Sequence, residues 1–117
     1  MRKVFTVKGY KLEGRSAGSF KLDLRYACKE VPLYSKKAGA PYVKNLGQLV
    51  FGIPDKWKGL FTMRIEKETE TEAEISIYLD HRISMFMSEL EDIKSLLKQG
   101  LETLKKDGII KDYEEVK

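Results

Sequence analysis

Residues 61–79 read FTMRIEKETETEAEISIYL, and this stretch decides the expected fold. Apolar residues alternate with polar ones at both ends of it, with the period of two that is typical of half-buried β-strands. If both apolar sets face one core, the strands pair antiparallel with Phe61 opposite Leu79 and Ile65 opposite Ile75. The glutamate-rich centre then forms the turn and the solvated face of a hairpin.

Three more strands are expected upstream of this hairpin. In residues 5–12 the apolar parity changes after Val7, which a bulge near Gly9 explains. Residues 19–28, SFKLDLRYAC, alternate without interruption and predict a second strand. A shorter strand over residues 48–53 precedes a proline, whose missing N–H donor ends it.

Downstream of the hairpin the apolar spacing changes to three and four, which predicts an amphipathic helix over residues 82–106. Gly108 is placed to end this helix, while Ser88 and Glu91 fit a capping box that would allow a break. Gly100 inside a helix costs about 1 kcal/mol relative to alanine, so it predicts a close packing contact or a weak point.

Together these elements predict an α+β fold, with a curved antiparallel sheet of about five strands packed in two layers on one long C-terminal helix. A chain of 117 residues has the length of one domain. We expect its sheet within residues 2–80, a long loop over 29–47, the helix over 82–106 and a short C-terminal tail.

Charge is distributed unevenly along the chain. Residues 1–64 contain 14 basic and 4 acidic side chains, a balance of +10, while the remainder has 8 and 14, a balance of −6. Such asymmetry is typical of a surface for nucleic acid or for an acidic protein. It also fits two parts of one fold that neutralise each other, and the sequence leaves both interpretations open.

Composition sets the expected compartment. Hydrophobic residues make up 42% and charged residues 34% of the chain, as in soluble globular proteins. No apolar run approaches the ~18 residues of a membrane span, and the N-terminus lacks a signal-peptide pattern. We therefore expect a cytoplasmic protein. Abundant lysine and glutamate with few side-chain amides add the hypothesis of a thermophilic source.

The chain offers few groups for catalysis. His81 is its only histidine and Cys28 its only cysteine, so a zinc site or a catalytic triad lacks the usual residues. We expect Cys28 to be a small core residue and His81 to have a surface or capping role. The prediction is a binding protein rather than an enzyme, without a metal, a cofactor or a catalytic residue.

The candidate binding surface consists of cations and aromatics outside the expected core. They are Lys21, Arg25, Lys29, Lys36, Lys37, Lys44, Arg64, Tyr34 and Tyr42. A basic sheet face and a lysine-rich loop would contact phosphates or carboxylates, while exposed aromatic rings could stack on bases. We expect this surface to bind nucleic acid or an acidic protein.

One short segment supports nucleic acid as the partner. Residues 46–50, followed by Ile53, Pro54, Trp57 and Gly59, resemble the strand-Ile-Pro element of swapped-hairpin DNA-binding folds of the AbrB type. The spacing departs from that pattern, so the resemblance implies no residue roles.

Two alternative functions remain open. The expected outline resembles helix-grip proteins, which implies a carrier of a small apolar ligand with Met63, Met85, Phe86 and Met87 lining its pocket. The C-terminal helix also carries surplus apolar residues, Met85 and Leu96, beside its main stripe. These would suit a structural subunit that forms a homo-oligomer through this helix.

Overall fold

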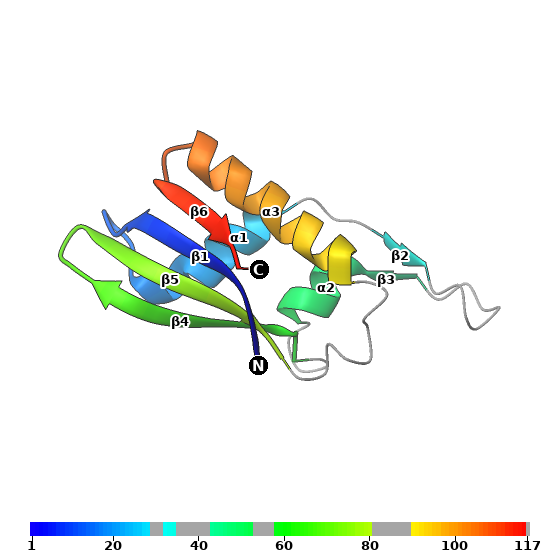
Figure 1. Cartoon of the computed structure of the whole chain (residues 1–117). Helices are drawn as coiled ribbons and strands as arrows, with labels where there is room; N and C mark the ends of the chain where they lie inside the picture. The colour runs from blue at the N-terminus through cyan, green and yellow to red at the C-terminus, as the bar shows by residue number, and fades with distance from the viewer. Residues whose placement is uncertain (29–31, 35–42, 53–57, 81–89, 117) are drawn as a thin grey trace.

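The computed structural model describes residues 1–28, 32–34, 43–52, 58–80 and 90–116. A four-stranded antiparallel sheet forms its centre, in the order β4-β5-β1-β6 (Figure 1). The strands are β1 (Arg2–Lys11), β4 (Phe61–Glu68), β5 (Glu72–Leu79) and β6 (Asp112–Glu115). The helices are α1 (Phe20–Ala27), α2 (Leu46–Phe51) and α3 (Leu90–Lys106), and a short 3-10 turn, η1 (Ala17–Ser19), precedes α1. Two further strands, β2 (Pro32–Tyr34) and β3 (Val43–Asn45), form a separate ribbon.

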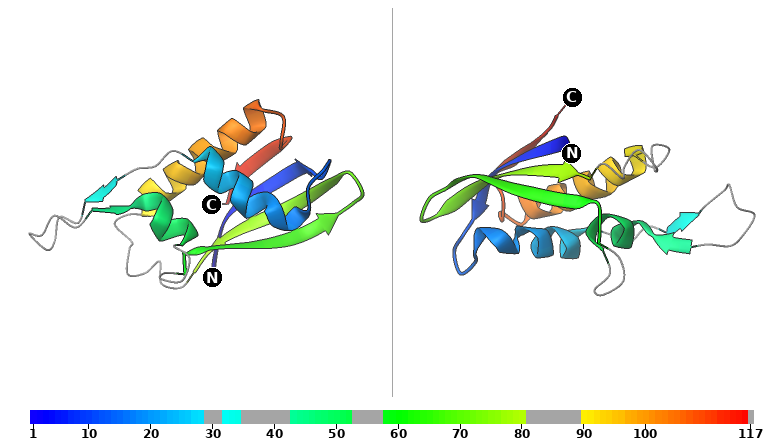
Figure 2. Two further views of the ribbon diagram at one scale, coloured as in Figure 1. Left: turned by 180° about the vertical axis from the view of Figure 1, so that it is seen from behind. Right: turned by 90° about the horizontal axis from the view of Figure 1, so that it is seen from below.

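The strand order defines the topology. β1 and β4 are parallel with β5 between them, and β5 and β6 are parallel with β1 between them. Helix α1 lies in the connection from β1 to β4, and α3 connects β5 to β6. Two interleaved βαβ units of this kind give the connectivity of the ferredoxin-like fold. The helices all lie on one face of the sheet, and no described element covers the other face (Figure 2).

The predicted hairpin is confirmed in its register. Phe61 pairs with Leu79 and Ile65 with Ile75, and the turn lies between Glu68 and Glu72. The predicted bulge in β1 is confirmed as well, because the register shifts between Val7 and Tyr10, and Gly9 there has a φ of +69°. Glycine adopts this left-handed conformation without the strain that a Cβ would add.

The strand predicted over residues 19–28 is wrong, because this segment forms α1. Phe20 and Leu24 are fully buried and Cys28 is half-buried, whereas Leu22 and Tyr26 are exposed. Residues four apart share one face of a helix and also one face of a strand, so the buried residues satisfied both periods. The pattern therefore could not distinguish the two structures by its core residues.

The strand predicted over residues 48–53 is also wrong, because residues 46–51 form the helix α2. Leu49, Val50 and Phe51 are buried, and the Phe51 ring centroid lies 5.3 Å from that of Phe61. The resemblance to the AbrB-type strand element therefore does not extend to the structure. Ile53, Pro54 and Trp57 lie outside the described residues.

The C-terminal tail is ordered as strand β6, which the sequence analysis did not predict. Tyr113 pairs with Val7, and its ring packs edge-on at 6.2 Å from Phe5. Its hydroxyl donates a hydrogen bond to Glu102 of α3, and Lys94 of α3 lies 3.9 Å from Glu115. Two predicted strands are helices, and β6 was missed, so the sheet has four strands rather than about five. It is open and not curved around a single helix. The short strands β2 and β3 were missed as well, because they lie within the segment expected to be a long loop over 29–47.

Helix α3 matches the described part of the predicted helix, and Gly108 with a φ of +73° follows its end as expected. Residues 82–89, including Ser88 of the predicted capping box, lie outside the described part. Leu96 is 1% exposed and belongs to the core. Its apolar side chain is therefore explained by the core of the fold, and not by a free interface.

The predicted close contact at Gly100 is confirmed. A Cβ at this position would lie only 2.5 Å from Cys28 Sγ and 2.9 Å from Leu24 Cδ1. Glycine thus allows α1 and α3 to pack side by side on the sheet. Within the described residues, no helix combines the length and the apolar character needed to cross a membrane.

Candidate binding surface on helix α1

Helix α1 is held at both ends, by the sheet at its N-terminal end and by α3 at its C-terminal end. At its N-terminal end Tyr10 of β1 packs edge-on against Phe20, with 5.1 Å between the ring centroids. The Tyr10 hydroxyl donates a hydrogen bond of 2.5 Å to Asp23 Oδ2 and lies 2.9 Å from Ser19 Oγ. Burial, with a smaller effect from the hydrogen bond to Asp23, raises the pKa of Tyr10 to about 12. The tyrosine hydroxyl is protonated at neutral pH, and its hydrogen bond fixes the orientation of α1 on the sheet.

At its C-terminal end α1 packs against α3 through the glycine contact. Cys28 caps the helix, and its thiol lies 3.5 Å from the backbone oxygen of Leu96. Burial raises the pKa of Cys28 to about 12, which favours the protonated thiol at neutral pH. Cys28 is half-buried and packs against the core rather than lying within it, and it ends a helix, so the predicted buried strand position is wrong.

The side of α1 opposite to the core carries two cations and two large apolar groups. We call Lys21, Leu22, Arg25 and Tyr26 the α1 outer face. Tyr26 is 81% and Leu22 is 52% exposed, and both lysine and arginine are exposed. Because Lys21 and Arg25 are one turn apart, and so are Leu22 and Tyr26, they form two adjacent rows.

The cations of this face are not neutralised within the described structure. Asp23 is occupied by Tyr10 and by Arg15, whose Nε lies 3.5 Å from Asp23 Oδ2. Neither Lys21 nor Arg25 forms an ion pair with another described residue. A shallow depression between α1 and α3 is lined by Ala27 of α1 and by Ser95, Lys98, Gln99, Glu102 and Thr103 of α3.

The structure does not bring all the predicted binding residues together. Lys21 and Arg25 lie on α1, on the helical side of the sheet, whereas Arg64 is exposed on β4 and points to the uncovered face with its partner Ser76. Tyr34 and Lys44 belong to the β2–β3 ribbon, which lies apart from the four-stranded sheet (Figures 1 and 2). Lys29, Lys36, Lys37 and Tyr42 fall outside the described residues.

Most of the predicted apolar pocket cannot be placed. Met63 is half-buried on β4 and packs against the core, while Met85, Phe86 and Met87 lie outside the described residues. In the described part of the chain the apolar side chains form one packed cluster from sheet and helices.

The sequence analysis missed Leu22 and Tyr26 as surface residues. The strand pattern placed Leu22 and Tyr26 on the inward side with the core residues, whereas the helix turns both outward. A helical plot of residues 20–28 separates the two sets, because Phe20, Leu24 and Cys28 fall on one side and Leu22 and Tyr26 on the opposite side.

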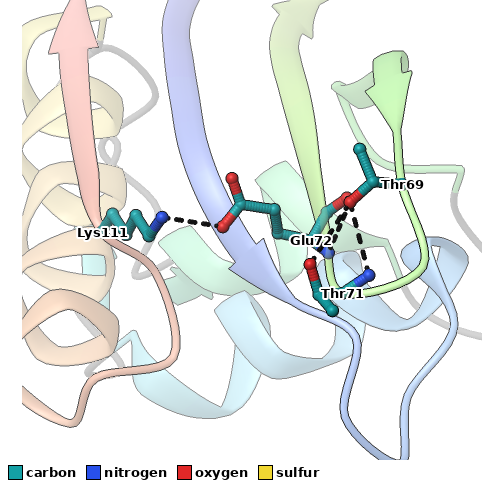
Figure 3. Close-up of polar contacts among 4 residues, drawn as sticks. All are labelled: Thr69, Thr71, Glu72 and Lys111. Atoms are coloured by element: carbon teal, nitrogen blue, oxygen red, sulfur yellow. Dashed lines mark hydrogen bonds and ion pairs between the residues drawn. The ribbon is translucent and has the colours of Figure 1, made fainter.

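The acidic hairpin is largely solvated, as predicted, and it has its own polar contacts (Figure 3). Thr69 Oγ1 accepts hydrogen bonds from the N–H groups of Thr71 at 3.3 Å and Glu72 at 3.1 Å, which fixes the turn. Lys111 Nζ lies 2.9 Å from Glu72 Oε2 and ties the hairpin to the segment before β6. This glutamate is thus neutralised by the C-terminal half of the chain, not by the basic α1.

Among the described residues, no three His, Cys, Asp or Glu side chains are grouped closely enough to hold a metal ion. His81 lies outside them. Comparison of the chain with protein-family models, with curated proteins and with solved structures found no match.

Proposed function

We propose that this protein is a non-enzymatic binding module that engages an acidic macromolecule, with nucleic acid as the first candidate, through the α1 outer face. The lysine-bearing segment 29–44 would extend the contact. The observation that supports this proposal best is Tyr26, which is 81% exposed beside two unpaired cations. An aromatic ring in the row next to Lys21 and Arg25 offers stacking close to phosphate contacts.

The rigid seating of α1 favours this function. Tyr10 holds one end of the helix and Gly100 allows close packing at the other. The backbone that carries the outer face is thereby ordered before a partner binds. Binding then costs the entropy of a few side chains rather than that of a folding segment.

The uncovered face of the sheet is a weaker candidate, because its cations lie opposite carboxylates of the neighbouring strands. Lys8 lies opposite Asp112, and Lys67 lies opposite Glu74. Arg64 Nε lies 3.9 Å from Glu66 Oε1. A phosphate backbone approaching this face would meet as many carboxylates as cations.

An acidic protein is the second candidate, and Leu22 is the observation that favours it. A leucine that is 52% exposed next to Tyr26 gives an apolar pair one turn long. Such a pair suits an apolar anchor on a partner helix better than it suits a nucleotide.

Fluorescently labelled single-stranded RNA and DNA, titrated at several salt concentrations, test the proposal. We expect binding whose logarithmic affinity falls with log salt, with a slope of about −0.7 for each phosphate contact. Arg25→Glu should weaken binding at least about tenfold, and Tyr26→Ala should weaken it without changing the salt slope.

The matched control is Lys3→Glu, which makes the same charge change at an exposed position of β1. It should leave the affinity within about threefold of the wild type. Absence of binding at low salt would eliminate nucleic acid. Equal losses in Lys3→Glu and Arg25→Glu would show attraction by net charge rather than a site on α1.

A further inference from the structure

Strand β4 is an edge of the sheet with an apolar residue left uncovered. Within the described residues β4 pairs only with β5, so its outer backbone groups have no strand beside them. Ile65 of this strand is 41% exposed, although its partner Ile75 is fully buried. The strand contains no proline, and an open edge of this kind is suited to pairing with another strand.

The residues on either side of Ile65 carry opposite charges, so each would face the opposite charge in a second copy related by a two-fold axis. If two copies of β4 pair antiparallel with Ile65 opposite Ile65, then Arg64 of each copy lies opposite Glu66 of the other. Arg64 has a side chain that is 72% exposed, and its Nε is 3.9 Å from Glu66 Oε1 in the same strand. That separation is long for a hydrogen bond, so Arg64 can contact a carboxylate of a second copy.

The other symmetric registers are less favourable. An axis at Arg64 places the two arginines opposite each other, and an axis at Glu66 does the same for two glutamates, which is destabilising in a sheet. An axis at Met63 places Ile65 opposite Phe61, whose side chain is already buried, with 5% exposed. Only the axis at Ile65 joins opposite charges and covers the exposed isoleucine.

We propose that two copies of this chain associate through β4, paired antiparallel about Ile65, so that the two four-stranded sheets become one continuous sheet of eight strands. The second copy is the partner that the self-complementary charges fit. The register shift between Ile65 and Lys67 makes Glu66 the extra residue of a bulge, so the backbone ladder between the copies is short and Arg64 and Glu66 meet through their side chains. The interface is therefore small, and the association is weak and dependent on concentration.

Sedimentation equilibrium of the full chain, over concentrations up to about the millimolar range, tests the association. Wild-type protein should show a monomer–dimer equilibrium. Arg64→Glu and Glu66→Arg should each reduce the association constant at least tenfold, because each places two like-charged pairs across the axis. The double variant, with both substitutions, restores both pairs in reverse and should return to within about threefold of the wild type.

The matched control is Arg25→Glu, which changes the net charge as Arg64→Glu does but lies on α1. It should leave the dimer intact, and circular dichroism should show that every variant is folded. Wild-type monomer at all concentrations overturns the proposal, and so does a double variant that remains as weak as the single variants. Amide exchange that slows with concentration in β6 but not in β4 would overturn it too, because the edge in use would be the other one.

Discussion

Replacing Gly100 with alanine tests how closely α1 and α3 pack. The new Cβ would lie 2.5 Å from Cys28 Sγ, whereas non-bonded heavy atoms pack at about 3.5–4.0 Å. One helix must therefore shift by about 1 Å, and overpacking of this kind costs ~1–3 kcal/mol. Alanine recovers about 1 kcal/mol through its higher helix propensity. We expect Gly100→Ala to lower the free energy of unfolding by about 1 kcal/mol in the balance of these two effects.

A double-mutant cycle separates the contact from the propensity. In a Cys28→Ala background the sulfur is gone, and the nearest remaining neighbour, Leu24 Cδ1 at 2.9 Å, is the end of a flexible side chain, while the Leu24 backbone oxygen at 3.4 Å is almost at normal contact distance. Gly100→Ala should then be neutral or stabilising, which gives a coupling of ~1–2 kcal/mol between the two positions. Urea unfolding of the four proteins measures it, with Ser95→Ala on the exposed side of α3 as the propensity control. Strict additivity, within about 0.5 kcal/mol, would refute the close contact.

Three more predictions concern Tyr10, Cys28 and Gly59. Tyr10→Phe should cost about 1.5 kcal/mol in urea unfolding at neutral pH, since it removes a hydrogen bond to the charged Asp23. The pKa of Tyr10 is raised from 10.0 to about 12, so as the pH rises the unfolded chain loses this proton before the folded protein does. The free energy of unfolding of the wild type should therefore fall between pH 10 and 12, and it should fall less in Tyr10→Phe. Cys28 should react with a thiol reagent at pH 8 only on the timescale of unfolding, and fast modification of the folded protein would contradict its raised pKa. Gly59→Ala should cost ~3 kcal/mol or more in thermal unfolding. The new Cβ would lie 2.1 Å from the backbone oxygen of Val50, which cannot rotate away. An unchanged melting temperature would contradict that contact.

The hairpin could be predicted because its information is local. Its apolar residues recur at a spacing of two on both strands, and the parity of the two sets fixes Phe61 opposite Leu79. In α1 the corresponding information is ambiguous. Phe20, Leu24 and Cys28 fit a strand as well as a helix, and only the exposure of Leu22 and Tyr26 decides between them. That exposure depends on α3, which lies far away in the sequence.

Strand β6 shows a second limit of local patterns. It is four residues long and has one apolar residue with a clear partner, Tyr113, which packs on Phe5. Nothing in such a short segment predicts a strand until β1 is available for pairing. The prediction of the candidate site was limited in the same way. Lys21 and Arg25 were identified as cations, but the wrong element placed them beside Arg64, which lies on the other face of the sheet.

The central position of β1 has a consequence for how the chain folds. This strand is near the beginning of the sequence, yet both of its neighbours, β5 and β6, come from the later part. Val7 must wait for Ile75 and Tyr113 before its backbone and side chain are covered on both sides. Contacts between such distant residues require long loops to close, which slows folding. During synthesis, therefore, the apolar Phe5 and Val7 stay exposed until most of the chain has emerged, and this is the period in which the protein is most open to aggregation or to a chaperone.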